Sequence, residues 1–141
     1  MSARKLPRAF FDTNVLVYAD DLDYPAKQLT ARKLWAEYRL AGSGVVSLQV
    51  LQEYFVNVTR KLGVDPEIAR QKIELLTEFN MIVLSAADVL AAVDLHRSDK
   101  ISFWDALIVR AASKSGCRVL FTEDMQHGRV VDGVEIVNPF L

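Results

Sequence analysis

Four acidic residues stand at places where a fold could gather carboxylates into one cleft. Asp12 directly follows the apolar run 9–11, and Asp124 comes soon after the apolar run 118–122. Asp105 and Glu53 each lie near the start of an expected helix. Ionised carboxylates in one cleft repel one another, so they must protonate, stand apart or hold a cation. Hard oxygen ligands favour magnesium or manganese, and such ions support hydrolysis of phosphodiester bonds.

Each of these acids also has a structural interpretation. Asp12 would suit the N-cap of a short helix, and Asp124 would suit a turn. Asp105 lies three residues after Ser102 and could complete a capping box with it. Glu53 lies outside the apolar face of its helix, as expected for a solvent-exposed residue. Glu123 competes with its neighbour Asp124 for the fourth position. Taken one at a time, the residues leave these alternatives open.

Other kinds of catalytic site find little support in the sequence. The two histidines, His96 and His127, are far apart and lack the spacing of zinc ligands. The chain has one cysteine, Cys117, so it contains no internal disulfide framework, as is typical of a reducing cytoplasm. There is no Gly-x-Ser-x-Gly, Walker A or Gly-x-Gly-x-x-Gly motif. The formal net charge of -1 indicates that the surface as a whole is not basic, so a nucleic-acid site in this chain would need local residues that bind phosphate.

The elements that would position these acids alternate between strands and helices. The chain of 141 residues is predicted to form one domain, residues 1–141. Its basic start lacks the apolar stretch of a signal peptide, and no apolar run is long enough for a membrane helix. Strands are predicted at 9–11, 45–47, 81–84, 118–122 and 134–137, and helices at 25–41, 48–62, 66–79, 86–97 and 101–112. This alternation predicts an α/β fold, a three-layer α/β/α sandwich with a central parallel sheet of about five strands. In such folds, the sites lie outside the carboxyl ends of the strands.

Four segments of the chain resemble the motifs of a known family. Segment 11–18, Phe-Asp-Thr-Asn-Val-Leu-Val-Tyr, resembles the opening motif of PIN-domain nucleases, especially VapC-type toxins. Three later segments resemble the remaining motifs in the same order: 47–54 with Glu53, 102–108 with Asp105, and 121–124 with Asp124. The fourth segment departs from the family, which often has an aromatic residue shortly after this aspartate, where the present chain continues Met-Gln-His-Gly.

The resemblance implies a PIN-like endoribonuclease that depends on Mg²⁺ or Mn²⁺ and hydrolyses RNA. It also implies a homodimer in the cytoplasm and a cognate antitoxin that masks the active site of the toxin. Asp12, Asp105 and Asp124 would bind metal directly or through water, and Glu53 would bind metal or orient the attacking water. The residues that would support these carboxylates or a metal-bound water are Asn14 and Thr122.

Contacts to the RNA are less specific in the sequence. Arg97, Lys100 and Arg129 lie near the acidic motifs and are candidates for phosphate contacts, although each also reads as ordinary solvated surface. Tyr18, Tyr24 and Trp104 have rings that could stack on bases, with Trp104 expected in the core.

Other functions remain open at this point. They are a PIN-like module that binds RNA or protein without catalysis, a nucleic-acid-processing nuclease outside toxin–antitoxin systems, and a receiver-type phosphoacceptor domain. The last of these fits poorly, because the third predicted strand ends without an aspartate.

Overall fold

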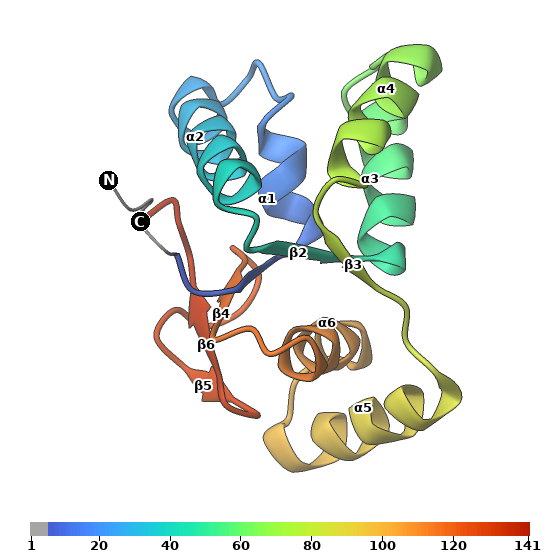
Figure 1. Cartoon of the computed structure of the whole chain (residues 1–141), viewed down its shortest axis with the longest axis vertical. Helices are drawn as coiled ribbons and strands as arrows, with labels where there is room; N and C mark the ends of the chain where they lie inside the picture. Colours follow the sequence, from blue (N-terminus) through green and yellow to red (C-terminus); the bar gives the residue numbers. More distant parts are fainter. Residues whose placement is uncertain (1–5) are drawn as a thin grey trace.

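The structure is a computed structural model, in which residues 6–141 are described. The helices are α1 Thr13–Tyr18, α2 Pro25–Ala41, α3 Leu48–Arg60, α4 Pro66–Leu76, α5 Ala86–Asp99 and α6 Phe103–Lys114. The strands are β1 Ala9–Phe11, β2 Gly44–Ser47, β3 Asn80–Ile82, β4 Val119–Phe121, β5 Val130–Val131 and β6 Val134–Val137. Helices α1 to α4 lie on one side of the sheet, and α5 and α6 lie on the other (Figure 1). The predicted three-layer α/β/α architecture is confirmed.

The sheet has six strands in the order β3-β2-β1-β4-β6-β5. Five strands pair in parallel, and β5 pairs with β6 in antiparallel orientation. The sequence prediction of about five parallel strands missed β5, which has two residues. Between β5 and β6 stand Asp132 and Gly133, both with positive φ (50° and 77°), as a two-residue type I′ hairpin turn requires. The Asp-Gly pair was the signal that could have revealed this hairpin.

Local chemistry explains where several helices begin and end. Ser47 closes β2, and its hydroxyl accepts a hydrogen bond from Val50 N, which starts α3. Asp65 caps α4 with proline at the first helical position, as predicted. The predicted helix 66–79 ends earlier, at Leu76, because the chain turns into β3 at residue 80. The predicted helix 101–112 begins at 103, because Ser102 is its N-cap.

The core is densest around the first strand. Ala9, Phe10 and Phe11 are fully buried, since β1 lies in the middle of the sheet with helices over both faces. The Phe11 ring meets Tyr38, Phe79 and Phe121 edge-on, with centroids 5.3–5.5 Å apart. This packing fixes the backbone that carries Asp12.

Two aspartates with buried side chains join helices to one another. Asp88, at the start of α5, forms ion pairs with Arg110 (3.0 Å) and Lys114 (2.5 Å) of α6. Asp20, just after α1, accepts a hydrogen bond from Tyr54 Oη of α3 at 2.5 Å and pairs with Lys72 of α4. These contacts hold together the helices that form the walls of the site.

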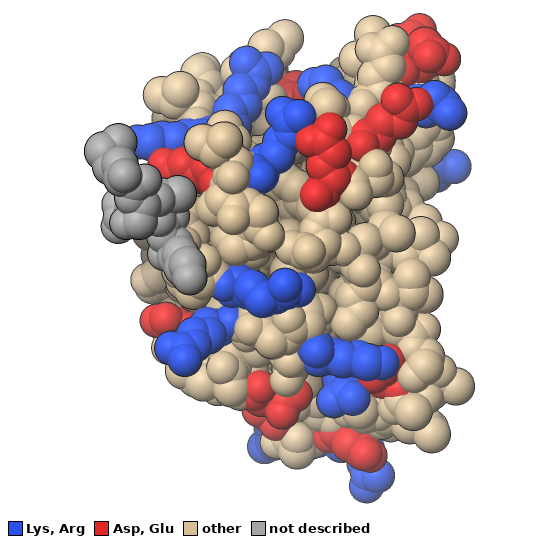
Figure 2. Space-filling view, viewed as in Figure 1, with Lys and Arg blue, Asp and Glu red and all other residues tan. Residues whose placement is uncertain are grey.

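Charges on the surface are mixed. Acidic and basic side chains are interspersed on the face shown in Figure 2, with no field of a single sign. This fits the net charge of -1. Within residues 6–141, no helix combines the length and the apolar character needed to cross a membrane.

Candidate active site

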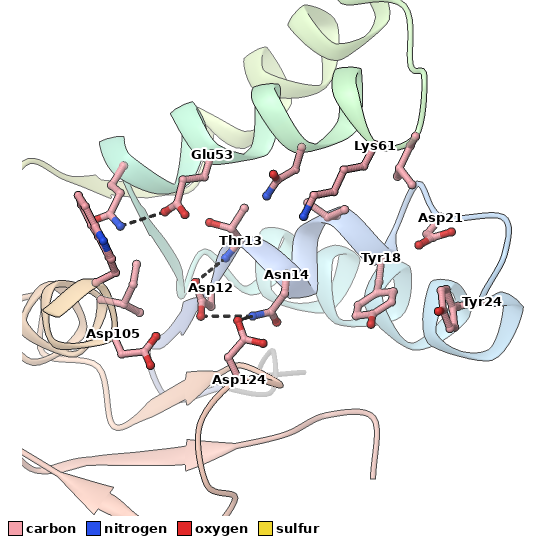
Figure 3. A pocket seen from close by; sticks show the side chains of 16 residues that line it. Asp12, Thr13, Asn14, Tyr18, Asp21, Tyr24, Glu53, Lys61, Asp105 and Asp124 are labelled. Carbon is pink, nitrogen blue, oxygen red and sulfur yellow. Dashed lines mark hydrogen bonds between the residues drawn. The ribbon is translucent and has the colours of Figure 1, made fainter. Parts of the chain in front are cut away.

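The four predicted acids line one cleft, with a volume of about 530 Å³. Asp12 lies where β1 ends, Glu53 on α3, Asp105 in the first turn of α6, and Asp124 in the loop after β4. Figure 3 shows their carboxylates facing a common space between α1, α3 and α6. The carboxyl ends of β1 and β4 are neighbours in the sheet, as the strand-end rule requires.

Asp12 is a helix cap and also lines the acidic cleft. It is the N-cap of α1, and Oδ1 accepts a hydrogen bond from Thr13 N at 2.8 Å. Its other oxygen, Oδ2, accepts from Thr122 Oγ1 at 2.8 Å and from Asn14 Nδ2 at 3.3 Å. Only 6% of the residue is exposed. Its carboxylate therefore has one oxygen committed to the helix and the other directed toward the acidic cluster.

Asn14 and Thr122 connect two of the acids. The amide nitrogen of Asn14 donates to Asp124 Oδ2 at 2.9 Å and also lies 3.2 Å from Thr122 Oγ1. Thr122 Oγ1 in turn accepts from Asp124 N at 3.1 Å. The predicted supporting residues thus bridge Asp12 and Asp124, and Figure 3 shows Asn14 beside both acids.

Asp124, and not Glu123, is the acid that faces the cleft. The Glu123 carboxylate turns away to form an ion pair with Lys27 at 2.7 Å and to accept a hydrogen bond from Tyr18 Oη at 2.6 Å. Its backbone N donates to Asn14 Oδ1 at 3.2 Å. Glu123 therefore supports the site from outside, and the competition between these neighbours is decided by geometry.

The other two acids approach from the helices. Asp105 N donates to Ser102 Oγ at 3.0 Å, so Ser102 caps α6, but the Asp105 carboxylate does not accept the reciprocal bond from Ser102 N that a complete capping box has. The Asp105 carboxylate remains available to the cleft. Glu53 Oε1 accepts a hydrogen bond from Gln49 Nε2 at 2.9 Å, one turn earlier on α3.

Burial and mutual repulsion disfavour negative charge in this cleft. The pKa of Asp12 is raised to about 7, chiefly by burial; the hydrogen bonds from Thr122 and Thr13 oppose this rise, and the nearby charges of Asp124 and Glu53 contribute to it. Burial also raises the pKa of Asp105, with a smaller contribution from Asp124. A cation in the cleft would favour the ionised form of every one of these carboxylates.

The donor set fits a hard divalent cation, because every candidate ligand offers oxygen. Among residues 6–141, however, no three acidic, histidine or cysteine side chains gather closely enough to surround one ion by themselves. Mg²⁺ is commonly held by one or two carboxylates and keeps several waters, and this arrangement matches the spread of the acids.

A second hollow of about 260 Å³ adjoins the first and shares Asp105 and Asp124 with it. Lys100 and Arg129, two of the three predicted phosphate contacts, line this hollow. Arg129 Nη2 donates to the Asp99 carbonyl at 2.6 Å, which holds its side chain in place. Arg97, the third candidate, lines neither hollow. Two basic side chains, Lys100 and Arg129, therefore line the hollow next to Asp105 and Asp124.

Sequence reasoning missed one wall of the cleft. Besides the predicted Glu53, this wall is formed by Gln49 and Asn57 of α3 and by Lys61, the C-cap residue of α3, and the four residues follow one another at intervals of four. This spacing places polar side chains on one helical face and was visible in the sequence. Trp104 was expected in the core, and this was wrong. The residue is 65% exposed and lines the cleft, because α6 buries its opposite face.

Comparisons with known proteins agree with this geometry. The family model for the PIN domain matches residues 9–132. A search of curated proteins finds no significant match. Among solved structures, VapC20 of Mycobacterium tuberculosis, described as a sarcin–ricin loop cleaving toxin, is 26% identical with a TM-score of 0.66, over 82% of this chain and 91% of that chain.

Two further structures share the fold. A toxin–antitoxin complex from Klebsiella pneumoniae is 22% identical with a TM-score of 0.69, over 93% of this chain and 97% of the other. VapBC2 from Rickettsia felis, bound to a DNA fragment from its promoter, is 19% identical with a TM-score of 0.63, over 91% and 96%. Since the family model covers most of the sequence, and the four motifs occur in order within one cleft, the chain belongs to the PIN domain family.

Proposed function

We propose that this chain is a divalent-metal-dependent endoribonuclease that hydrolyses RNA phosphodiester bonds and acts as the toxin of a toxin–antitoxin pair. The observation that carries the proposal is the meeting of four carboxylates, from four separate parts of the chain, in one cleft. The chain is a VapC-like ribonuclease of the PIN domain family, and VapC toxins are endoribonucleases. PIN-domain nucleases depend on divalent metal.

The cation proposed here is Mg²⁺ or Mn²⁺, because the donors are hard oxygens. When bound, such an ion lowers the pKa of water and neutralises charge on phosphate oxygens. Asp12, Asp105 and Asp124 would hold the ion directly or through water. Glu53, on the opposite wall, would hold it or orient the attacking water.

Other residues of the chain position these groups and the substrate. Asn14 and Thr122 fix the separation of the Asp12 and Asp124 side chains through the hydrogen bonds described above. Lys100 and Arg129 would contact phosphates on one side of the scissile bond. These two contacts add affinity that weakens with salt and do not read the base sequence.

The wider assignments belong to the same proposal. The whole chain, residues 1–141, forms one nuclease domain, although residues 1–5 lie outside the described part. It acts in the cytoplasm as a homodimer, and a cognate antitoxin protein binds it and masks the cleft. The relatives described as toxin–antitoxin complexes support an antitoxin partner.

The test is cleavage of a mixed RNA pool by the purified, partner-free protein with Mg²⁺, with Mn²⁺ and with EDTA. Asp12→Asn removes one acid of the cleft, and Asp94→Asn removes an exposed carboxylate on α5 that lines neither hollow. We expect metal-dependent cleavage by the wild type and by Asp94→Asn, and none by folded Asp12→Asn. Cleavage that persists in EDTA, or equal cleavage by Asp12→Asn, would refute the proposed site. A folded protein that binds RNA without cutting any of it would identify a binding module.

A further inference from the structure

The cleft continues well beyond the four acids. From Asp12 it follows α1 to Tyr18, Asp21 and Tyr24, while α3 forms the facing wall as far as Lys61 (Figure 3). Glu53 and Lys61 are eight residues apart, which is about 12 Å along a helix axis. An RNA strand with its scissile phosphate at the acids would therefore place a neighbouring nucleotide at this far end.

The far end has a fixed aromatic surface. The rings of Tyr18 and Tyr24 meet edge to face, with centroids 5.6 Å apart. Lys27 lies over both rings, at 4.7 and 5.5 Å from their centroids, and is held by Glu123 at 2.7 Å. Tyr18 Oη donates to the same carboxylate. Tyr24 is nevertheless 50% exposed, so part of its ring remains available for stacking on a base.

A buried carboxylate stands beside these rings. Asp21 is 9% exposed and lines the cleft, where Figure 3 shows it next to Tyr18 and Tyr24. Its Oδ1 accepts a hydrogen bond from Asp23 N at 3.0 Å. Within residues 6–141, no protein donor is found for Oδ2, and no cation forms an ion pair with Asp21. An oxygen with this placement is ready to accept a hydrogen bond from a ligand.

The charges at this end distinguish base from phosphate. The Asp21 carboxylate repels phosphate and accepts hydrogen bonds without donating any, so it selects a base edge that carries N–H groups. Guanine presents two adjacent donors there, N1–H and the 2-amino group, whereas uracil presents one and adenine an amino group beside an acceptor. Lys61, which has no acidic partner within 4.0 Å among residues 6–141, lies across the cleft to take the phosphate.

Resting on the proposed ribonuclease function, we propose that Tyr18, Asp21, Tyr24 and Lys61 form a nucleotide subsite that binds an unpaired guanine beside the cleavage position. Tyr24 stacks on the base, Asp21 accepts hydrogen bonds from its N1–H and 2-amino groups, and Lys61 contacts the phosphate. Tyr18 is a positioning residue for Tyr24. The subsite selects which RNA positions are presented to the acids.

The test is a binding measurement that needs neither metal nor catalysis. Fluorescence anisotropy in EDTA compares short single-stranded RNAs that differ at one position, with guanine, inosine, adenine or uracil there. The protein carries Asp12→Asn throughout. We expect guanine to bind about tenfold more tightly than adenine, with inosine in between because it lacks the 2-amino group.

Variants of the subsite separate its parts. Asp21→Asn keeps an oxygen that can accept from the Asp23 N–H. It replaces the other acceptor oxygen by an NH₂ donor, and should therefore abolish the guanine preference. Tyr24→Ala should weaken binding of all the RNAs by about tenfold, and Tyr24→Phe should restore it. Asp23→Asn, next to the subsite and exposed, is the matched control and should leave the preference unchanged.

The outcomes distinguish this inference from the function on which it rests. RNA binding without a guanine preference, or with a preference that survives Asp21→Asn, would refute the subsite and leave the nuclease proposal standing. An absence of binding to any RNA at low salt would also refute the subsite, whereas the nuclease proposal is refuted only by the cleavage assay with metal described above.

Discussion

Replacing Asp12 by asparagine is expected to change how the stability of the metal-free protein depends on pH. In the folded protein, burial raises the pKa of Asp12 to about 7, against an ordinary value of 3.8. Because the folded-state pKa is the higher one, folding favours the protonated carboxyl. Its stabilising contribution is fully present below pH 3.8 and is lost as the pH rises through about 7.

The size of the effect follows from the distance between the two pKa values. They differ by about three units, and each unit corresponds to about 1.4 kcal/mol. Between pH 5 and pH 8, the wild type should lose about 3 kcal/mol of stability that the asparagine variant keeps. The variant also loses the Oδ2 acceptor for Thr122 Oγ1 and Asn14 Nδ2, which lowers its own stability by a constant amount. Because the variant has no ionisable group at residue 12, the difference between the two slopes reports the titration of Asp12 alone.

Urea denaturation in EDTA at several pH values, followed by circular dichroism, measures the difference. The curves of stability against pH should diverge above pH 5, with the wild type falling more steeply. Asp94→Asn, on an exposed face of α5, should run parallel to the wild type. Saturating Mn²⁺ should raise the stability of the wild type above neutral pH and have less effect on Asp12→Asn. Parallel curves for the wild type and Asp12→Asn in EDTA would refute the claim that this carboxyl is buried with a raised pKa.

Three other substitutions test the framework of the site, with stability measured by urea denaturation in the first two. Gly44→Ala would bring a Cβ within 2.6 Å of the Phe79 ring and should lower the free energy of unfolding by about 1–3 kcal/mol. Adding Phe79→Leu to the same chain should restore part of this loss. Tyr54→Phe removes the hydrogen bond to buried Asp20 and should cost about 1.5–3 kcal/mol, and an unchanged midpoint would contradict that bond. Asp105→Asn should weaken Mn²⁺ binding by about tenfold or more in a paramagnetic resonance titration, and an unchanged titration would remove Asp105 from the site.

The positions of the main acids were predictable because they depend on local rules. Asp12 follows a fully buried strand, and parallel strands bring their carboxyl ends to one edge of a sheet. Asp105 follows its N-cap Ser102 by three residues, so its place in the first helical turn is set by the capping pattern. For these residues, a few neighbours in the sequence decide the structure.

The remaining features depend on contacts between distant segments. The choice of Asp124 over Glu123 is made by Lys27 and Tyr18, which lie 96 and 105 residues from Glu123. The exposure of Trp104 depends on which face of α6 meets the sheet, and a helix that is apolar on nearly every side does not specify this. In these cases the type of each residue was known from the sequence, but the distant residue or surface that it contacts was not.

The pairing of β1 with β4 has a consequence for the timing of folding. Phe11 lies in register with Phe121, and Asn14 reaches Thr122 across 108 residues. At a synthesis rate of about 5–20 residues per second, roughly 5–20 s pass between the making of the first of these strands and the second. Until then β1 lacks a neighbour on one side, and Asp12 stands apart from Asp124. A chain released before residue 121 therefore lacks the cleft, so the acidic cluster is complete only after residue 124 has been made.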